Sequence, residues 1–179
     1  FDDVVDSITT KLINRHPHVF SDLSIEDSKA QADHWEKIKI EERKQKHGIN
    51  SILDDIGTNQ PALNVAYKIG KRARSVGFDW SNVGGVIDKI EEEIEELKVA
   101  INSGNQSNIE EEAGDLLFSI VSLSRHTSID PESALRKANK KFDQRFRSME
   151  SALKESNKEF SHMTERELDK LWENVKEKE

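Results

Sequence analysis

Two acidic runs contain the side chains of this sequence that are best placed to do chemistry. Glu93 and Glu96 are three residues apart in the first run, and Glu112 and Asp115 have the same spacing in the second. Residues three apart share one face of a helix, so each pair can present two carboxylates together. Carboxylate oxygens suit Mg²⁺ or Mn²⁺, whereas Zn²⁺ sites are usually built with nitrogen and sulfur ligands. Four carboxylates from two antiparallel helices could therefore hold one or two divalent cations.

The helical period does not identify every inward-facing residue of the first run. Its apolar stripe consists of Ile87, Ile90, Ile94, Leu97 and Ile101. On a helical wheel Glu93 lies about 80° from the centre of this stripe, and Glu92 falls on the exposed side. Glu91 borders the stripe at its other edge. Spacing alone therefore leaves the choice between Glu91 and Glu93 open.

The second run is harder to explain as a solvated helix surface. Glu110 and Glu111 lie where acidic residues favour the helix dipole, so these two need no function. Asp115 lies beyond the first turn, next to the apolar segment 116–123, which predicts a helix buried on most sides. Buried carboxylates without a partner cost several kcal/mol, and a divalent cation is the simplest compensation. A solvated acidic face remains the alternative for the first run.

Helices must position these carboxylates, and the sequence predicts an all-α bundle. Apolar residues recur at spacings of three and four, and no convincing period-two strand occurs. The predicted helices cover approximately residues 4–13, 28–46, 61–76, 86–102, 107–126, 131–153 and 164–176. Capping boxes are predicted at Ser107–Glu110 and Thr164–Glu167, and Asp130 is a predicted N-cap.

Composition narrows the function classes. Charged residues make up 35% of the 179 residues and apolar residues 34%, with only 8 Gly and 3 Pro, as long helices allow. Without cysteine there is no disulfide or thiolate zinc site, which fits a cytoplasmic protein. The net charge of −8 argues against a duplex nucleic-acid partner, and no apolar run suits a membrane span. We expect a chain that starts at Phe1 to be part of a longer protein.

The acidic runs also resemble a known signature. Residues 92–96 (EEIEE) followed by 112–115 (EAGD) are similar to the EExxE…ExxD pattern of the all-α nucleoside triphosphate pyrophosphohydrolases of the MazG family. Further similar segments follow in order along the chain, at residues 16–20, 35–36, 41–43, 77–80, 114–118 and 138–146. The resemblance covers essentially the whole chain.

The resemblance implies hydrolysis of a nucleoside triphosphate to the monophosphate and pyrophosphate. It implies Mg²⁺, with Mn²⁺ as a possible substitute, bound by Glu93, Glu96, Glu112 and Asp115. Glu92 and Glu93 are the expected catalytic carboxylates, one of which would orient or deprotonate the attacking water. The implied substrate contacts are Lys89, Glu92, Glu111, Lys141, Arg145, Trp172 and Lys176.

The resemblance further implies two tandem copies of the helical domain in the whole protein. Residues 1–20 would then be the last helix of a first copy, residues 21–60 a helical linker and residues 61–179 the catalytic domain. We expect a homodimer, with no nucleic-acid or membrane partner. The alternative is a non-catalytic dimerisation or partner-binding module with an acidic structural face. A di-iron bundle is less suitable because the acidic helices lack Glu-x-x-His pairs.

Overall fold

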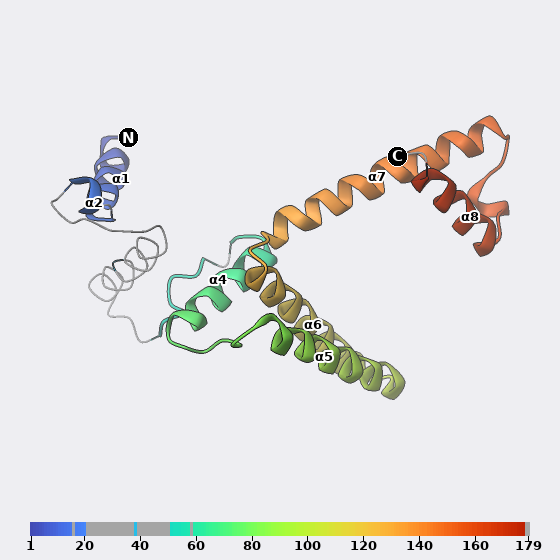
Figure 1. Cartoon of the computed structure of the whole chain (residues 1–179). Helices are drawn as coiled ribbons and strands as arrows, with labels where there is room; N and C mark the ends of the chain where they lie inside the picture. The colour runs from blue at the N-terminus through green and yellow to red at the C-terminus, as the bar shows by residue number, and fades with distance from the viewer. Residues whose placement is uncertain (16, 21–37, 39–50, 58, 178–179) are drawn as a thin grey trace. The chain divides into compact units, whose positions relative to one another are not determined.

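We describe the chain from a computed structural model, over residues 1–15, 17–20, 38, 51–57 and 59–177 (Figure 1). Helices joined by turns and loops make up these residues, and no strand occurs among them. The expected all-α class is confirmed. None of the helices in the described ranges is both long and apolar enough to cross a bilayer. The chain divides into two compact units, residues 1–56 and 57–179, and each is described by itself.

The first unit contains helices α1 (Asp2–Arg15) and α2 (Pro17–Phe20). Helix α1 ends directly before the residue preceding Pro17, as the steric restriction at that position predicts. Val4, Ile8 and Leu12 on α1 are exposed. The predicted connecting helix over residues 28–46 lies, apart from Ile38, outside the described residues.

The second unit is built around a helical hairpin. Its elements are α4 (Ala62–Ser75), α5 (Val83–Ser103), α6 (Gln106–His126), α7 (Pro131–Glu155), the short 3₁₀ helix Phe160–His162 and α8 (Glu165–Lys176). Helices α5 and α6 pack along one another, and α4 packs on α6. Helix α7 leaves this group at its first turns and runs away from the hairpin, with α8 packed against its far part (Figure 1).

The turn between α5 and α6 differs from the prediction. Gly104 ends α5 with φ of 70°, a conformation that glycine adopts without steric cost. The Asn105 side chain then accepts hydrogen bonds from the backbone N–H groups of Ser107 (3.1 Å) and Asn108 (3.4 Å). The predicted Ser107–Glu110 capping box is therefore wrong, because Asn105 is the N-cap and α6 starts at Gln106, which places Ser107 inside the helix.

The other two predicted caps are confirmed. The Asp130 carboxylate accepts a hydrogen bond from the Ser133 N–H at 2.6 Å, which starts α7 at Pro131. The Thr164 hydroxyl accepts from the Glu167 N–H at 3.4 Å, while the Glu167 carboxylate accepts from the Thr164 N–H at 2.9 Å. Both halves of the capping box are present, so local sequence defines the start of α8.

The core of a single chain is small, and α6 is less buried than predicted. Among the described residues, the buried apolar ones are Val86, Ala100, Val121, Met149 and Leu153. On α6, Leu117 is 56% exposed and Ile120 is 44% exposed. The expectation that α6 is buried on most sides is wrong for one chain, because α4 and α5 cover part of it and α7 turns away (Figure 1).

A buried ion pair fastens the loop between α4 and α5 to the end of α6. Arg125 donates two hydrogen bonds to the Asp79 carboxylate, at 2.6 and 2.5 Å, and His126 Nε2 lies 3.0 Å from Asp79 Oδ1. A Cβ atom at Gly70 would meet Arg125 Nε at 3.0 Å, so this glycine makes room for the guanidinium beside α4. The Arg125 hydrogen bonds hold the pKa of Asp79 well below its usual range.

Replacing Asp79 with Asn removes the charge that pairs with the buried Arg125. We expect Asp79→Asn to lower the free energy of unfolding at pH 7 by about 3 kcal/mol, measured by urea denaturation. Because the pKa of Asp79 is lowered in the folded state, its contribution is present above its ordinary pKa of 3.8 and is lost as the pH falls below that value. The difference in the free energy of unfolding between wild type and Asp79→Asn should therefore become smaller at acidic pH.

The exposed pair Asp143–Arg147 on α7, at 2.9 Å, provides the matched control. Asp143→Asn should leave the midpoint of urea denaturation close to that of wild type, because an exposed pair spaced i,i+4 contributes little. Equal effects of the two substitutions would contradict the structural role assigned to Asp79.

Candidate active site

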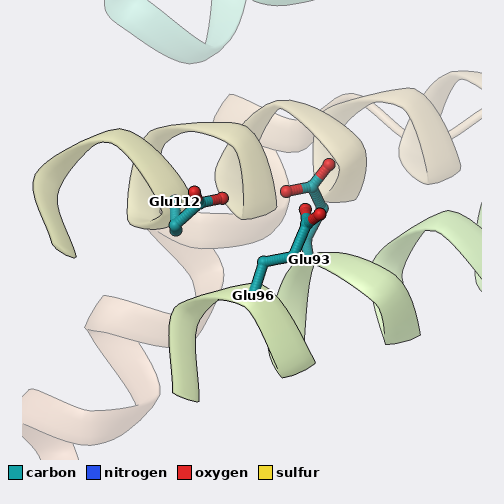
Figure 2. A group of neighbouring side chains, drawn as sticks. All are labelled: Glu93, Glu96 and Glu112. Carbon is teal, nitrogen blue, oxygen red and sulfur yellow. The ribbon is translucent and has the colours of Figure 1, made fainter. Parts of the chain in front are cut away.

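Three carboxylates meet between α5 and α6. Glu93 and Glu96 come from α5 and Glu112 from α6, and one oxygen of each lies within 4.8 Å of the others. Figure 2 shows the three side chains reaching into the space between the two helices. We call these residues the acidic cluster.

The structure identifies Glu93 as the inward-facing residue of the first acidic run. Its side chain is 5% exposed, whereas Glu91 is exposed. Lys89 Nζ lies 2.8 Å from Glu93 Oε1, but Glu93 Oε2 is buried without a hydrogen-bond partner. An unsatisfied buried acceptor costs about 1–3 kcal/mol, and more when it is charged. A cation or donor bound beside this oxygen would remove that cost.

Glu112 experiences the same excess of negative charge. Its side chain is half-buried. Desolvation, followed by the charges of Glu96 and Glu93, raises the pKa of this carboxyl above its usual value of 4.5. A bound cation would reverse both effects, because it replaces lost water contacts and attracts the ionised form. Within the described part of the chain, the cluster offers only carboxylate oxygens, a donor set that fits Mg²⁺ or Mn²⁺.

The other predicted residues of the acidic helices lie around this cluster. Asp115 is exposed and outside the group of three, although its charge also raises the pKa of Glu112. Glu111 is exposed and precedes Glu112 on α6. Glu92 is exposed, and its Oε1 accepts a hydrogen bond from Lys89 at 2.8 Å.

Lys89 contributes more than its position in the sequence indicated. Its ammonium group pairs with both Glu92 and Glu93, each at 2.8 Å. These hydrogen bonds, to Glu92 first and Glu93 second, raise the pKa of Lys89 above its usual range. Lys98 pairs instead with Glu95, at 2.7 Å. The i,i+3 and i,i+4 spacings can be read from the sequence, but the partner of each lysine cannot.

The basic and aromatic residues predicted to contact substrate form a second group on α7 and α8. The Arg145 guanidinium lies 5.7 Å from the centroid of the Trp172 ring, and the Phe142 ring lies 5.2 Å from it. Lys176 pairs with Glu173 on α8 at 2.8 Å. Lys141 is exposed on α7. Since α7 runs away from the hairpin, one chain does not bring this group to the acidic cluster (Figure 1).

A cavity of about 330 Å³ adjoins the cluster and was missed by the sequence reasoning. It shares Glu96 and Glu112 with the cluster, and its other lining residues are Glu95, Val99, Ala100, Ser103 and Asn108. Ser103 and Asn108 lie on either side of the turn between α5 and α6. No motif marks them, because only the geometry of that turn brings them together.

Comparison with known proteins agrees with this geometry. The family model described as the MazG nucleotide pyrophosphohydrolase domain matches residues 84–149, which include the acidic cluster. Nucleoside triphosphate pyrophosphohydrolase of Escherichia coli (strain K12) is 44% identical over 181 residues, covering all of this chain and 68% of that protein. The chain belongs to the MazG family.

Two further relatives extend this MazG comparison. The nucleoside triphosphate pyrophosphohydrolase/pyrophosphatase MazG of Thermotoga maritima is 44% identical over 175 residues, covering 98% of this chain and 65% of that protein. Uncharacterized protein YabN of Bacillus subtilis is 38% identical over 179 residues, covering 99% of this chain and 36% of that protein. These similarities include α1 and α8, so the resemblance extends well beyond the acidic helices.

The acidic cluster predicts a response of this MazG chain to metal. Mg²⁺ or Mn²⁺ at ten times its Kd should raise the melting temperature by about 4 °C, because binding favours the folded state. Glu112→Gln should abolish this shift. Differential scanning fluorimetry of the two proteins, with Glu110→Gln on the same helix as the control, measures the effect. A normal metal response in Glu112→Gln would contradict the assigned cluster.

The same variant tests the charge repulsion without metal. Because the pKa of Glu112 is raised in the folded state, its ionisation destabilises the fold as the pH rises through that pKa. Glu112→Gln should therefore be more stable than wild type at pH 7, and this gain should disappear below about pH 4.5.

Proposed function

We propose that this MazG chain hydrolyses nucleoside triphosphates to nucleoside monophosphate and pyrophosphate, with Mg²⁺, or Mn²⁺ in its place. The buried, unpartnered Glu93 Oε2 within the acidic cluster carries this proposal. The matched family model and the names of the relatives support the same activity. In the reaction a water oxygen bonds to the α-phosphorus while the α–β phosphoanhydride bond breaks and pyrophosphate leaves.

Glu93, Glu96 and Glu112 are the proposed metal ligands, joined by Asp115 from the next turn of α6. Bound Mg²⁺ would neutralise the phosphate charge and polarise the attacked phosphoryl group. The protein's part is to hold four carboxylates on two helices that pack along one another, so that the substrate meets a fixed charge arrangement. Without a cation the cluster would repel a triphosphate.

Glu92 is the proposed base that takes a proton from the attacking water. Lys89 holds one Glu92 oxygen at 2.8 Å, and the exposed side chain can present its other oxygen to a water beside Glu93. Glu93 supports this step because its Oε1 also pairs with Lys89, at 2.8 Å. General-base catalysis of this kind requires the carboxylate to lie within hydrogen-bond reach of the water. Lys89 and Glu111 are the nearest proposed substrate contacts.

Two copies of the chain are proposed to form the complete site. Lys141, Arg145, Trp172 and Lys176 lie on an arm that leads away from the cluster of the same chain (Figure 1). Leu117 and Ile120 on α6 expose apolar surface that a second chain could bury. A homodimer in which the α7–α8 arm of one copy approaches the hairpin of the other satisfies both requirements. The basic arm would then contact the phosphates held at the acidic cluster.

Pyrophosphate release from a panel of ribo- and deoxyribonucleoside triphosphates tests the activity. We expect release that depends on Mg²⁺, and a loss of kcat/KM of at least about 100-fold in Glu112→Gln, because removing a metal ligand removes transition-state charge stabilisation. Glu110→Gln should retain activity. Orthophosphate as the product would place cleavage at another bond. No release by a folded, metal-binding protein would favour a non-catalytic binding module.

Mixing two inactive variants tests whether the dimer shares its sites. One carries Glu112→Gln, and the other carries Lys141→Ala with Arg145→Ala. If each site uses residues of both copies, a mixed dimer has one intact site, and an equal mixture should recover about one quarter of wild-type activity. If each chain supplies its own complete site, no activity should return. Sedimentation analysis of the same samples reports whether dimers form.

A further inference from the structure

The connection between α6 and α7 is short and closely hydrogen-bonded. We call its residues, 127–130, the corner. The Ser128 N–H donates to the Arg125 carbonyl at 3.2 Å, and the Ile129 N–H donates to the Ser124 carbonyl at 2.7 Å. These two bonds form the Schellman motif, which ends a helix with one residue in the left-handed conformation. Ser128, with φ of 58°, is that residue.

The left-handed conformation is costly at Ser128 because this residue has a Cβ atom. In that conformation the Cβ lies too close to the following carbonyl oxygen, which is why glycine usually takes this position. Gly104 does so at the end of α5. Ser128 is exposed, so burial of its side chain does not repay the cost. Conformations of this kind persist where the surrounding structure holds them in place.

The two helices that meet at the corner are each fixed in place. On α6, Arg125 and His126 both bond to the Asp79 carboxylate, which anchors the last turn of that helix. On α7, Asp130 caps the first turn, Pro131 is buried, and the helix contacts α4 as well as α6. With both ends held, the backbone angles of the corner determine the angle at which α7 leaves the hairpin.

The length of α7 amplifies any change in this angle. Lys141 and Arg145 lie about 15 Å and 21 Å along the helix from Pro131. A change in direction of about 20°, the size of an ordinary helix kink, would displace Arg145 by about 7 Å. Ion pairs require approach within about 4 Å, and a misplacement of about 1 Å can lower a reaction rate about 100-fold. A small change at the corner would therefore remove both basic residues from a bound triphosphate.

We propose that Ser128 is a positioning residue whose left-handed conformation directs α7 so that Lys141 and Arg145 reach the substrate phosphates at the acidic cluster of the second copy. This inference rests on the proposed pyrophosphohydrolase function and its shared site. Ser128 acts through α7 and does not itself touch the substrate.

Substitutions at Ser128 separate its backbone conformation from its side chain. Ser128→Pro fixes φ near −65° and removes the N–H that bonds to Arg125, so the corner must rearrange. Ser128→Val disfavours the same conformation but keeps the N–H, and it is the second variant should the proline prevent folding. Ser128→Asn is the conservative variant, because asparagine tolerates the left-handed region.

The far end of α7 provides a matched control. Asn157 has φ of 52°, and its N–H donates to the Lys154 carbonyl at 3.2 Å in the same type of motif. Asn157→Pro therefore makes an equivalent change after α7 has ended. Circular dichroism confirms that each variant is folded.

The first measurement is the distance between a spin label on α5 and one on α7. The chain has no cysteine, so Asp88→Cys and Ser151→Cys, both at exposed positions, provide the two labelling sites. Dilution with unlabelled chain restricts the signal to pairs within one copy. We expect Ser128→Pro and Ser128→Val to shift or broaden the distance distribution by about 5–10 Å, since Ser151 lies about 30 Å along α7. Ser128→Asn and Asn157→Pro should leave it unchanged.

The second measurement is calorimetric binding of inorganic tripolyphosphate in the presence of Mg²⁺, with the chains unlabelled. We expect binding to weaken at least about tenfold in Ser128→Pro and Ser128→Val and to remain normal in Ser128→Asn, because the basic pair no longer reaches the phosphates. The rise in melting temperature with Mg²⁺ should be unchanged, because the acidic cluster lies within the hairpin. A general structural defect would reduce both responses.

Three results would overturn the inference. They are unchanged distances in both disruptive variants, altered distances with normal tripolyphosphate binding, and an equal loss of the Mg²⁺ and tripolyphosphate responses.

Pyrophosphate release by the wild type separates this inference from the function on which it rests. Release by the wild type, with unchanged distances in Ser128→Pro and Ser128→Val, would retain the function and reject the role of the corner. A redirected α7 with weakened tripolyphosphate binding, in a protein that releases no pyrophosphate, would retain the role of the corner in phosphate binding and reject the function.

Discussion

Like charges crowd the interface between α5 and α6, where carboxyl oxygens of Glu93, Glu96 and Glu112 lie within 4.8 Å of one another. Repulsion of this kind opposes folding unless positive charge offsets it. Lys89 offsets part of it through Glu93 Oε1, but Glu93 Oε2 remains unpartnered and the pKa of Glu112 is raised. The hairpin is therefore arranged to gain from a divalent cation.

A rigid frame is needed to keep such a cluster together without its cation. The α5–α6 turn is held by Gly104 and the Asn105 cap, and the start of α5 is tied to the end of α6 through Asp79 and Arg125. The two anchors lie at opposite ends of the hairpin. Between them, the helices cannot separate to relieve the repulsion without breaking a buried ion pair or a cap.

Local patterns gave the helices of the second unit to within three residues, because periodicity and the Asp130 and Thr164 caps are properties of neighbouring residues. Helical spacing also predicted Glu93 with Glu96 on one helix and Glu112 on the next, whereas Asp115 lies outside the group of three. Local patterns did not show which of Glu91 and Glu93 faces inward, because that depends on where α6 packs. They overestimated the burial of α6, because the described residues leave Leu117 and Ile120 exposed. The cavity at Ser103 and Asn108 was missed because it depends on the geometry of the turn.

The separation of acidic and basic groups within one chain has a physical consequence. If Lys141 and Arg145 lay on the hairpin, they would pair with the cluster as Lys89 does and would reduce its affinity for a cation. Because both residues lie on α7, which runs away from the hairpin, they leave the cluster anionic. In the proposed dimer, Lys141 and Arg145 approach the cluster only from the second copy. A triphosphate can then lie between these basic side chains and the acidic cluster. Glu93, Glu96 and Glu112 would hold the cation, whose charge would offset part of that of the phosphates, while Lys141 and Arg145 would neutralise the charge that remains on the substrate.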